Sequence, residues 1–279
     1  MTQKRDPITR ENGIYIFDPS ISQDNQDYHA ESLNILHKAE NKYFWFLARK
    51  ERILCMFNRY VPHDKKIIEL GAGTGNISHY LMNDGYDVAV GEMHIKGLRY
   101  AQAYGIQKCY QFDLFDPPFE NHFDAVGLFD VLEHLDQDLL ALQQCRSLLK
   151  ANGGKLILTV PAFNFLWSRD DAYGHKRRYT VKSLNRIVTN AGFNVLDCRY
   201  YFSAIMPLLF LRRIIHPDDG SPLAQEEYNS EIKINPLLNR LLKAVCRVEN
   251  KIYSFIPNFP GGSIILIAEK EAESIDPLQ

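Results

Sequence analysis

Short apolar runs alternate with stretches of helical periodicity through the middle of the chain. Five short runs of mostly apolar residues predict strands at 66–70, 87–91, 108–112, 123–129 and 155–160. Between them, apolar residues recur at helical spacing and predict helices near 75–84, 94–104 and 136–150. Strands that alternate with helices in this way are typical of a parallel sheet covered by helices on both faces.

The two ends of the chain show other patterns. Residues 1–27 are polar apart from 14–17 and predict a loose arm, whereas an apolar stripe over 30–60 predicts one or two helices with a break at Asn41. Towards the C-terminus, Thr180 is expected to cap a helix that ends near Gly192, and strands are expected near 194–201 and 262–270.

A further helix is predicted to begin at Asn235-Pro236, because proline is favoured at the first helical position after an asparagine cap. Its apolar positions follow helical spacing, so we expect them to bury one face of the helix: Leu238, Leu241, Leu242, Val245, Val248, Ile252 and Phe255.

Composition narrows the class of protein. The 279 residues carry a formal net charge of −2, which gives no field for non-specific binding of nucleic acid. Five cysteines are scattered singly, which argues against a disulfide framework or a structural zinc site. The N-terminus lacks the apolar core of a signal peptide, and the most apolar run, 205–215, is too short to span a bilayer. We therefore expect a cytoplasmic protein without stable membrane insertion.

The most informative motif is the run 67–75, Ile-Ile-Glu-Leu-Gly-Ala-Gly-Thr-Gly, between the first core strand and its helix. Alternate glycines let the backbone turn sharply and approach a ligand closely. The dinucleotide fingerprint requires a glycine where this chain has Asn76. The spacing Glu-x-Gly-x-Gly-x-Gly instead resembles motif I of the class I S-adenosylmethionine-dependent methyltransferases. The resemblance places the cofactor against Glu69, Gly71, Ala72, Gly73 and Gly75.

The ends of the next two strands carry acidic residues in register with this motif. Glu92, followed by Met93, stands about twenty residues beyond the glycines, where a carboxylate binds ribose hydroxyls. Asp113 and Leu114 follow the third strand, and the resemblance assigns them to the adenine. An aspartate that only caps a turn is an equal alternative for Asp113.

The run 123–135 resembles motif IV of the same superfamily and the Leu-Glu-His signature that follows it in several small-molecule methyltransferases. The resemblance directs Asp130 to the methionine end of the cofactor and places Glu133 and His134 at the floor of the acceptor pocket. Together the motifs identify the chain as a member of this superfamily.

Two further segments resemble a subfamily of bacterial methyltransferases that act on small molecules or peptides. In the aromatic segment 41–49, Arg49 is expected to bind the cofactor carboxylate and Tyr43 to contact the substrate. The run 174–180, Gly-His-Lys-Arg-Arg-Tyr-Thr, is expected to bind an anionic acceptor through Arg177, Arg178 and Tyr179, with a plain solvated turn as the alternative. A hydroxyl acceptor needs a base, and His134 and His175 are the candidates.

The expected fold is α/β, a Rossmann-like doubly wound sheet of seven strands whose last strand is antiparallel. Four parts are predicted: an N-terminal arm with helices (1–60), the cofactor-binding core (61–202), a helical insertion or cap (203–260), and a final strand with a tail (261–279).

The expected function is S-adenosyl-L-methionine-dependent O-methylation of a carboxylate or hydroxyl on a small molecule or peptide, with S-adenosyl-L-homocysteine as product. Nucleic acid is not expected as a partner, and the chain is expected to be a monomer or a homodimer. N-methylation, a nicotinamide-dependent oxidoreductase and a non-catalytic cofactor-binding module remain alternatives. Asp130, Glu133, His134 and His175 could instead hold a divalent metal, but no tight ligand spacing completes that set, so no metal is predicted.

Overall fold

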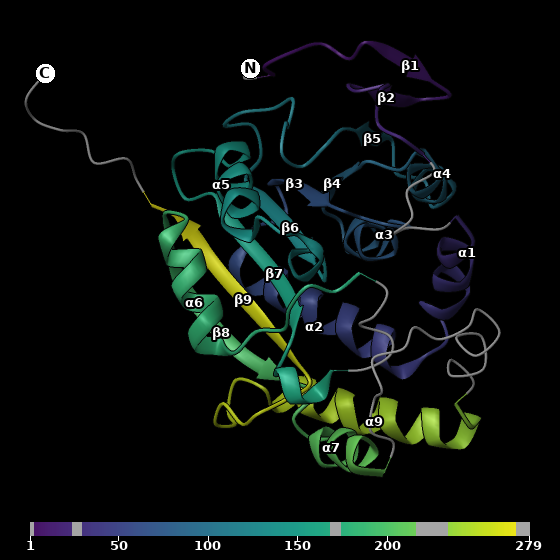
Figure 1. Ribbon diagram of the computed structural model, residues 1–279, viewed down its shortest axis with the longest axis vertical. Helices are drawn as coiled ribbons and strands as arrows, with labels where there is room; N and C mark the ends of the chain where they lie inside the picture. The colour runs from purple at the N-terminus through teal and green to yellow at the C-terminus, as the bar shows by residue number, and fades with distance from the viewer. Residues whose placement is uncertain (1–2, 24–29, 168–173, 216–233, 272–279) are drawn as a thin grey trace, which may run out of the picture.

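A nine-stranded sheet in the order β1-β2-β5-β4-β3-β6-β7-β9-β8 runs through the protein (Figure 1). The computed structural model describes residues 3–23, 30–167, 174–215 and 234–271. Its strands are β1 (Thr9–Glu11), β2 (Ile14–Ile16), β3 (Lys66–Leu70), β4 (Asp87–Glu92), β5 (Lys108–Gln111), β6 (Ala125–Phe129), β7 (Lys155–Pro161), β8 (Phe193–Tyr201) and β9 (Ser263–Lys270). Its helices are α1 (Ala30–Ala39), α2 (Phe44–Tyr60), α3 (Asn76–Asn83), α4 (Ile95–Ala103), α5 (Asp138–Leu148), α6 (Val181–Asn190), α7 (Met206–Ile215) and α9 (Pro236–Ile252), with short 3₁₀ turns η1 (Leu132–His134) and η2 (Asn164–Leu166).

The Rossmann-like core follows the predicted alternation. Strands β5, β4, β3, β6 and β7 are parallel, and β9 lies antiparallel between β7 and β8. Each predicted core strand lies within two residues of its observed bounds. All five residues of β6 are buried, as expected for a central strand covered on both faces. The predicted α/β class is therefore confirmed.

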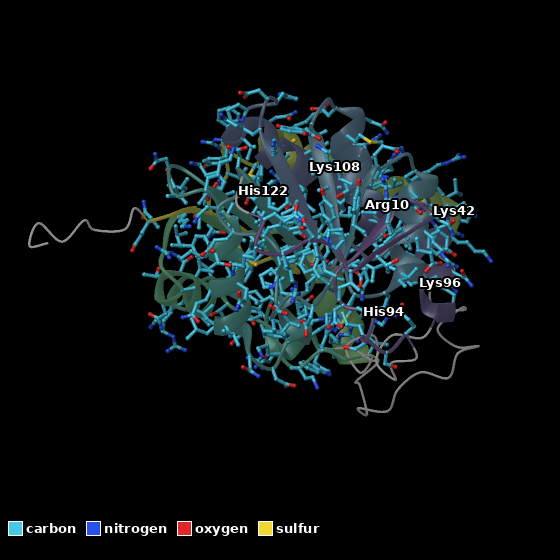
Figure 2. All side chains as sticks on the ribbon, turned by 90° about the horizontal axis from the view of Figure 1, so that it is seen from above. Arg10, Lys42, His94, Lys96, Lys108 and His122 are labelled. Carbon is cyan, nitrogen blue, oxygen red and sulfur yellow. The ribbon has the colours of Figure 1, made fainter. Side chains whose placement is uncertain are left out.

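The sheet has nine strands rather than seven because the N-terminal residues are not a loose arm. Ile14 and Ile16 are buried, and β2 pairs in parallel with β5, the edge of the core sheet. Asn12 and Gly13 both have positive φ, 49° and 89°, which is the backbone of a two-residue hairpin turn between β1 and β2. Figure 2 looks onto this end of the molecule, where Arg10 of β1 is labelled.

Helices cover both faces of the sheet. Apolar side chains of α5 and α6 pack with the sheet in one buried cluster, and those of α2, α3 and α9 pack with it in another. The predicted break at Asn41 separates α1 from α2. Thr180 caps α6 in a capping box with Ser183, and the side chain of Asn235 caps α9.

The face of α9 that the sequence predicts to be buried is buried only in part: Leu242 is buried and Val245 is half-buried beside the core. Leu238, Leu241, Val248 and Ile252 are exposed, and so is Phe255 beyond the helix end. The residues that α9 buries are Leu242, Cys246 and Glu249. The prediction therefore holds for Leu242 and is wrong for the exposed positions, because α9 packs on α2 through an adjacent strip of its surface.

The helices that the structure describes in the segment 203–260, α7 and α9, lie at one end of the molecule (Figure 1). The part of this segment at 216–233 lies outside the described residues. In the described part of the chain, no helix is both long and apolar enough to cross a bilayer.

Candidate active site

The glycine turn is closely packed. Gly71, Gly73 and Gly75 have φ of 62°, 55° and 74°, a region that side chains other than glycine rarely adopt. A Cβ on Gly71 would lie 2.7 Å from Cγ2 of Val131, and one on Gly75 would lie 2.7 Å from Cβ of Ala101. The turn therefore brings bare backbone to the carboxyl edge of the sheet, where ligands bind in such folds.

Glu92 joins the end of β4 to this turn. Its carboxylate accepts hydrogen bonds from the backbone N–H of Gly73 at 3.0 Å and of His94 at 3.0 Å. Burial raises the pKa of the carboxyl, and these two N–H groups oppose the rise. The predicted nucleoside contact is thus held in place by the same turn that approaches the ligand.

Two buried carboxylates form hydrogen bonds with residues in and just after the glycine turn. Glu69 accepts hydrogen bonds from the N–H and hydroxyl of Ser78, and Glu40 accepts one from the hydroxyl of Thr74. Burial raises the pKa of each to about 7. Glu69 is among the residues predicted from the sequence, whereas Glu40, which directly follows α1 and lies 34 residues before Thr74, is not.

Asn76 occupies the position where a dinucleotide-binding fold has glycine, and its side chain forms hydrogen bonds with three other residues. Its amide nitrogen donates to Oδ1 of Asn41 and to the hydroxyl of Tyr104, both at 3.2 Å. Lys50 also donates to its amide oxygen. Asn76 therefore ties the segment between α1 and α2 to the ends of the helices beside the turn.

Arg49 and Asp130 form an ion pair at the carboxyl end of β6. Nε of Arg49 lies 2.9 Å from Oδ2 of Asp130, and Oδ1 of Asp130 accepts a hydrogen bond from the hydroxyl of Thr159 at 2.8 Å. Burial opposes the charge of Arg49, but Asp130 and other acidic groups outweigh it and raise its pKa. The two residues that the sequence assigns to the methionine end of the cofactor therefore lie together.

The residues assigned to the adenine lie near the end of β5. Asp113 accepts a hydrogen bond from the N–H of Phe115 at 2.9 Å, which is the turn-capping geometry of the alternative interpretation. Leu114 is partly buried beside the core. The backbone oxygen of Met93 accepts hydrogen bonds from Gln23 and from the buried Gln111, two residues that no sequence motif singles out.

The two candidate bases meet after β6. The rings of His134 and His175 lie 4.5 Å apart, edge to face, although 41 residues separate them in the chain. Nε2 of His175 lies 3.9 Å from Oε1 of Glu133, and Lys176 donates its N–H to the carbonyl of Glu133 at 2.7 Å. The loop after β7 is thereby fixed against η1.

Glu133 is fully buried, and neither of its carboxylate oxygens has a hydrogen-bond partner among the described residues. Burial and the nearby Asp130 raise the pKa of Glu133 well above its usual value. A buried carboxyl with both oxygens available is rare in a folded protein and often belongs to a functional site.

The basic loop, residues 174–180, brings His175 next to Glu133 and His134, but its other polar side chains bond elsewhere. The guanidinium of Arg177 lies 2.8 Å from Oδ2 of Asp138 and also donates to the carbonyl of Asp136, while the hydroxyl of Tyr179 donates to Asp138 at 3.0 Å. Arg178 donates to the carbonyl of Ala162. These bonds attach the loop to the start of α5 and the end of β7. Tyr43 is half-buried and directly precedes α2 as its N-cap residue.

The donor set fits a zwitterionic nucleoside such as S-adenosyl-L-methionine. The glycine turn offers open backbone, Glu92 offers acceptor oxygens, and Arg49 offers a cation at the carboxyl end of β6. The same edge also carries a group that could hold a metal ion, since ligand atoms of Glu133, His134 and His175 all lie within 4.8 Å of one another.

Comparison with known proteins identifies the family. A profile described as a methyltransferase domain matches residues 37–197, more than half of the chain. The chain belongs to this methyltransferase family. The predicted membership of the class I S-adenosylmethionine-dependent methyltransferases is confirmed, and with it the assignment as an enzyme.

Individual relatives are distant. A ubiquinone biosynthesis O-methyltransferase of Pectobacterium atrosepticum is 28% identical over 103 residues, a match that covers 34% of this chain and 43% of that protein. The chain therefore matches less than half the length of this relative.

Two solved structures show the same fold. A protein of Bacillus halodurans C-125 assigned as a methyltransferase has a TM-score of 0.53 at 15% identity, covering 78% of this chain and 98% of that one. Phosphoethanolamine N-methyltransferase 2 of Haemonchus contortus, solved with S-adenosyl-L-methionine, has a TM-score of 0.56 at 14% identity, covering 91% of this chain and 61% of that one.

Proposed function

We propose that this methyltransferase transfers the methyl group of S-adenosyl-L-methionine to an oxygen atom of a small-molecule or peptide acceptor. The observation that carries the proposal is the group formed by Glu133 and His134, which follow β6, and by His175, which lies in the loop after β7. Bound S-adenosyl-L-methionine supplies an electrophilic methyl on a sulfonium. The chain must then hold an acceptor atom in line with that methyl and remove the acceptor's proton.

Separate residues bind the methyl donor and remove the proton of the acceptor. Gly73, Glu92 and Arg49 bind and orient the donor, and the Arg49–Asp130 pair keeps the guanidinium at the methionine end. His175 takes the proton of a hydroxyl acceptor as the C–O bond forms and the C–S bond breaks. Oε1 of Glu133 lies 3.9 Å from Nε2, and the positive charge that forms on the imidazole favours ionisation of this carboxyl, which then stabilises the imidazolium. The products are the methylated acceptor and neutral S-adenosyl-L-homocysteine.

N-methylation is the second candidate, because the fold is shared with a phosphoethanolamine N-methyltransferase. An ionised carboxylate acceptor would need no base, and Arg178 would then serve as its cation. A nicotinamide-dependent oxidoreductase and a non-catalytic module are no longer candidates, since the methyltransferase family match covers the whole glycine turn and the Glu-His segment.

The test is an acceptor screen with methyl-labelled donor. Phenols, carboxylic acids and amines are incubated with the protein, and the methylated atom is identified by mass spectrometry. Methylation of hydroxyl or carboxyl oxygen supports the proposal, whereas products methylated only on nitrogen overturn it. The variant Gly73→Val is the control, because a branched side chain at φ of 55° in the turn should abolish transfer to every acceptor.

A further inference from the structure

Helix α7 is an apolar helix that is left exposed by the elements that the structure describes. Its sequence, Met-Pro-Leu-Leu-Phe-Leu-Arg-Arg-Ile-Ile, contains no buried residue. Leu208, Phe210, Leu211, Ile214 and Ile215 are each about half exposed or more. Large apolar side chains gathered on one surface usually mark a site of interaction.

Helix α9 extends the same kind of surface. Along it, Leu237, Leu241, Val248 and Ile252 recur at helical spacing and are exposed, with Leu237 at 73%. The buried face of the helix, which includes Cys246, lies about a third of a turn away, as the period of 3.6 residues dictates. Packing on α2 therefore leaves a complete apolar face of α9 open to solvent.

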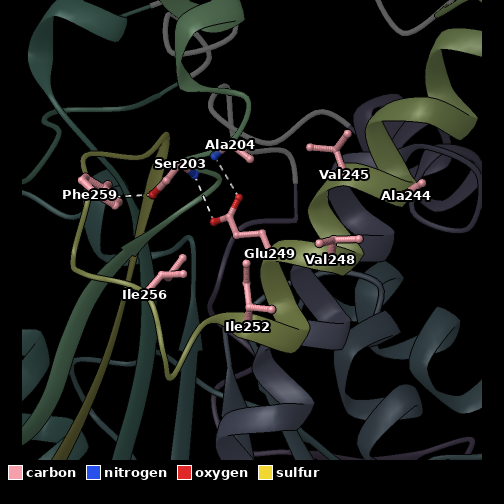
Figure 3. A pocket seen from close by; sticks show the side chains of 9 residues that line it. All are labelled: Ser203, Ala204, Ala244, Val245, Val248, Glu249, Ile252, Ile256 and Phe259. Atoms are coloured by element: carbon pink, nitrogen blue, oxygen red, sulfur yellow. Dashed lines mark hydrogen bonds between the residues drawn. The ribbon is translucent and has the colours of Figure 1, made fainter.

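The loop after α9 contributes aromatic side chains and a groove. Phe255 is 87% exposed and Phe259 is 56% exposed. Between α9 and this loop lies a groove of about 530 Å³, lined by apolar side chains such as Val248, Ile252 and Ile256 (Figure 3). We call the exposed apolar residues of α7, α9 and 255–259 the apolar face.

Polar contacts hold these pieces in one arrangement. The buried carboxylate of Glu249 on α9 accepts the N–H groups of Ser203 and Ala204, both at 3.0 Å, just before α7 (Figure 3). Arg199 of β8 donates to the carbonyls of Tyr253 and Ile256. These hydrogen bonds fix α9 and the loop after it to β8 and to the start of α7, so the parts of the apolar face keep one arrangement.

Basic side chains border the apolar face. Arg240, Lys243, Arg247 and Lys251 follow α9 at helical spacing on a third strip of its surface. Arg247 pairs with Glu51 of α2, whereas the other three make no ion pair with any residue that the structure describes. Among the described residues of 203–262, the only carboxylate side chain is that of Glu249, which is buried.

We propose that the apolar face seats the protein on a bilayer surface that carries anionic headgroups. A helix with one apolar and one basic strip is the kind that lies in the membrane interface, with apolar side chains among the acyl chains and cations at the headgroups. Exposed phenylalanines at a loop tip suit the same interface. A symmetric dimer through this face would instead bring two copies of the basic strip together, which like-charge repulsion opposes.

The position of the apolar face connects it with the active-site edge of the sheet. Helix α7 lies against η2, which directly follows β7, and the rings of Phe165 and Phe210 are in contact, 6.1 Å between centroids. The loop that carries His175 is attached to the end of β7 through Arg178 and Ala162. A protein seated in this way would hold its candidate acceptor site close to the bilayer surface.

The test is co-flotation of the whole chain with vesicles of phosphatidylcholine alone and of phosphatidylcholine mixed with phosphatidylglycerol. We expect binding to the mixed vesicles that weakens as salt is added. The double variants Leu241→Ser/Phe255→Ser and Arg240→Gln/Lys243→Gln should each reduce the bound fraction several-fold. Because these positions are not buried, thermal stability should be unchanged.

Matched controls lie elsewhere on the surface. Ile8→Ser changes an exposed apolar residue beside β1, and Lys182→Gln/Arg186→Gln removes two exposed cations from α6. Neither should alter flotation.

The proposal is overturned if the wild-type protein does not float with the mixed vesicles, or if control and face variants bind equally. A homodimer that Leu241→Ser/Phe255→Ser converts to monomer would also overturn it, because a second copy would then cover the apolar face. Flotation and donor binding are independent measurements, so failure here leaves the proposed methylation standing.

Discussion

Nε of Arg49 lies 2.9 Å from Oδ2 of Asp130, and this ion pair joins α2 to the end of β6. Asp130 has a φ of 53°, a conformation that aspartate and asparagine tolerate better than most residues. Asp130 thus holds the guanidinium of Arg49 at the carboxyl edge of the sheet, and its own backbone adopts an unfavourable conformation there.

The variant Asp130→Asn removes the negative charge of residue 130 and keeps the size and shape of its side chain. An asparagine side chain at this position tolerates the same backbone conformation and can still bond to Thr159, but it no longer neutralises Arg49. We expect the affinity for S-adenosyl-L-methionine to fall by about tenfold, which corresponds to ~1.4 kcal/mol. Titration calorimetry measures the affinity, and circular dichroism checks the fold. An unchanged dissociation constant would remove the ion pair from the donor site.

Glu92→Ala should weaken donor and product alike. Its carboxylate accepts hydrogen bonds from the backbone N–H of Gly73 in the turn and from that of His94, and it is the predicted ribose contact. Loss of a hydrogen bond to a charged group costs about 1.5–3 kcal/mol, so both affinities should fall roughly 10- to 100-fold. If turnover fell while both affinities held, Glu92 would belong to catalysis instead.

Glu40 should make the protein less stable as the pH rises. Burial raises the pKa of its carboxyl to about 7 in the folded protein, above the ordinary value of 4.5. The folded state therefore binds the proton more tightly, and this contribution is present below about pH 4.5 and lost as the pH rises through about 7.

The variant Glu40→Gln removes this ionisation. We expect the free energy of unfolding to become less dependent on pH between about 5 and 8, with a gain of at most roughly 3 kcal/mol at the upper end. Urea unfolding at several pH values measures it. A variant that keeps the wild-type pH dependence would show that Glu40 does not cause it.

His175→Ala should reduce transfer to a hydroxyl acceptor by about 10²–10⁴-fold, the usual contribution of a general base. Donor affinity should stay near that of the wild type, since the residue lies beside Glu133 and His134 rather than at the glycine turn. His134→Ala is the companion variant. Equal activity of wild type and both variants would exclude a histidine base.

Gly13→Ala tests the N-terminal hairpin. Gly13 has a φ of 89°, and a Cβ there would lie 2.9 Å from Nε2 of Gln102. We expect a loss of roughly 1–2 kcal/mol of unfolding free energy, which a lower melting temperature would report. Gly85→Ala is a useful comparison: it is also strained, with φ of 101°, but its Cβ would have ordinary contact with His63 at 3.7 Å. The Gln102 side chain can move away from the new Cβ only by giving up its hydrogen bond to the carbonyl of Asn12, so Gly13→Ala should cost more than Gly85→Ala by about that hydrogen bond.

The sequence predicts the core of the fold well because local patterns determine it. Lys66–Leu70 is predicted to the residue, since an apolar run that ends at alternating glycines has few other structures available. The N-terminal hairpin escapes prediction although Asn12-Gly13 is a strong hairpin signal, because each of its strands has only three residues.

The candidate site is predicted less completely, because some contacts depend on tertiary packing. No local pattern indicates that Glu40 reaches Thr74 or that His175 reaches His134. Periodicity also cannot choose between two apolar strips of one helix. In α9 it favours the strip with Leu241, whereas contact with α2 buries the strip with Cys246.

The position of β9 also has a consequence for the order in which the chain can fold during synthesis. It is the last of the nine strands to be made, yet it lies between β7 and β8 and pairs with both along their lengths. Until it leaves the ribosome, β7 and β8 each present an unpaired edge, whereas β2, the partner of β5, is available from the start. Completion of this sheet must therefore be a late event, and a nascent chain stalled before Ser263 would be the form most exposed to aggregation.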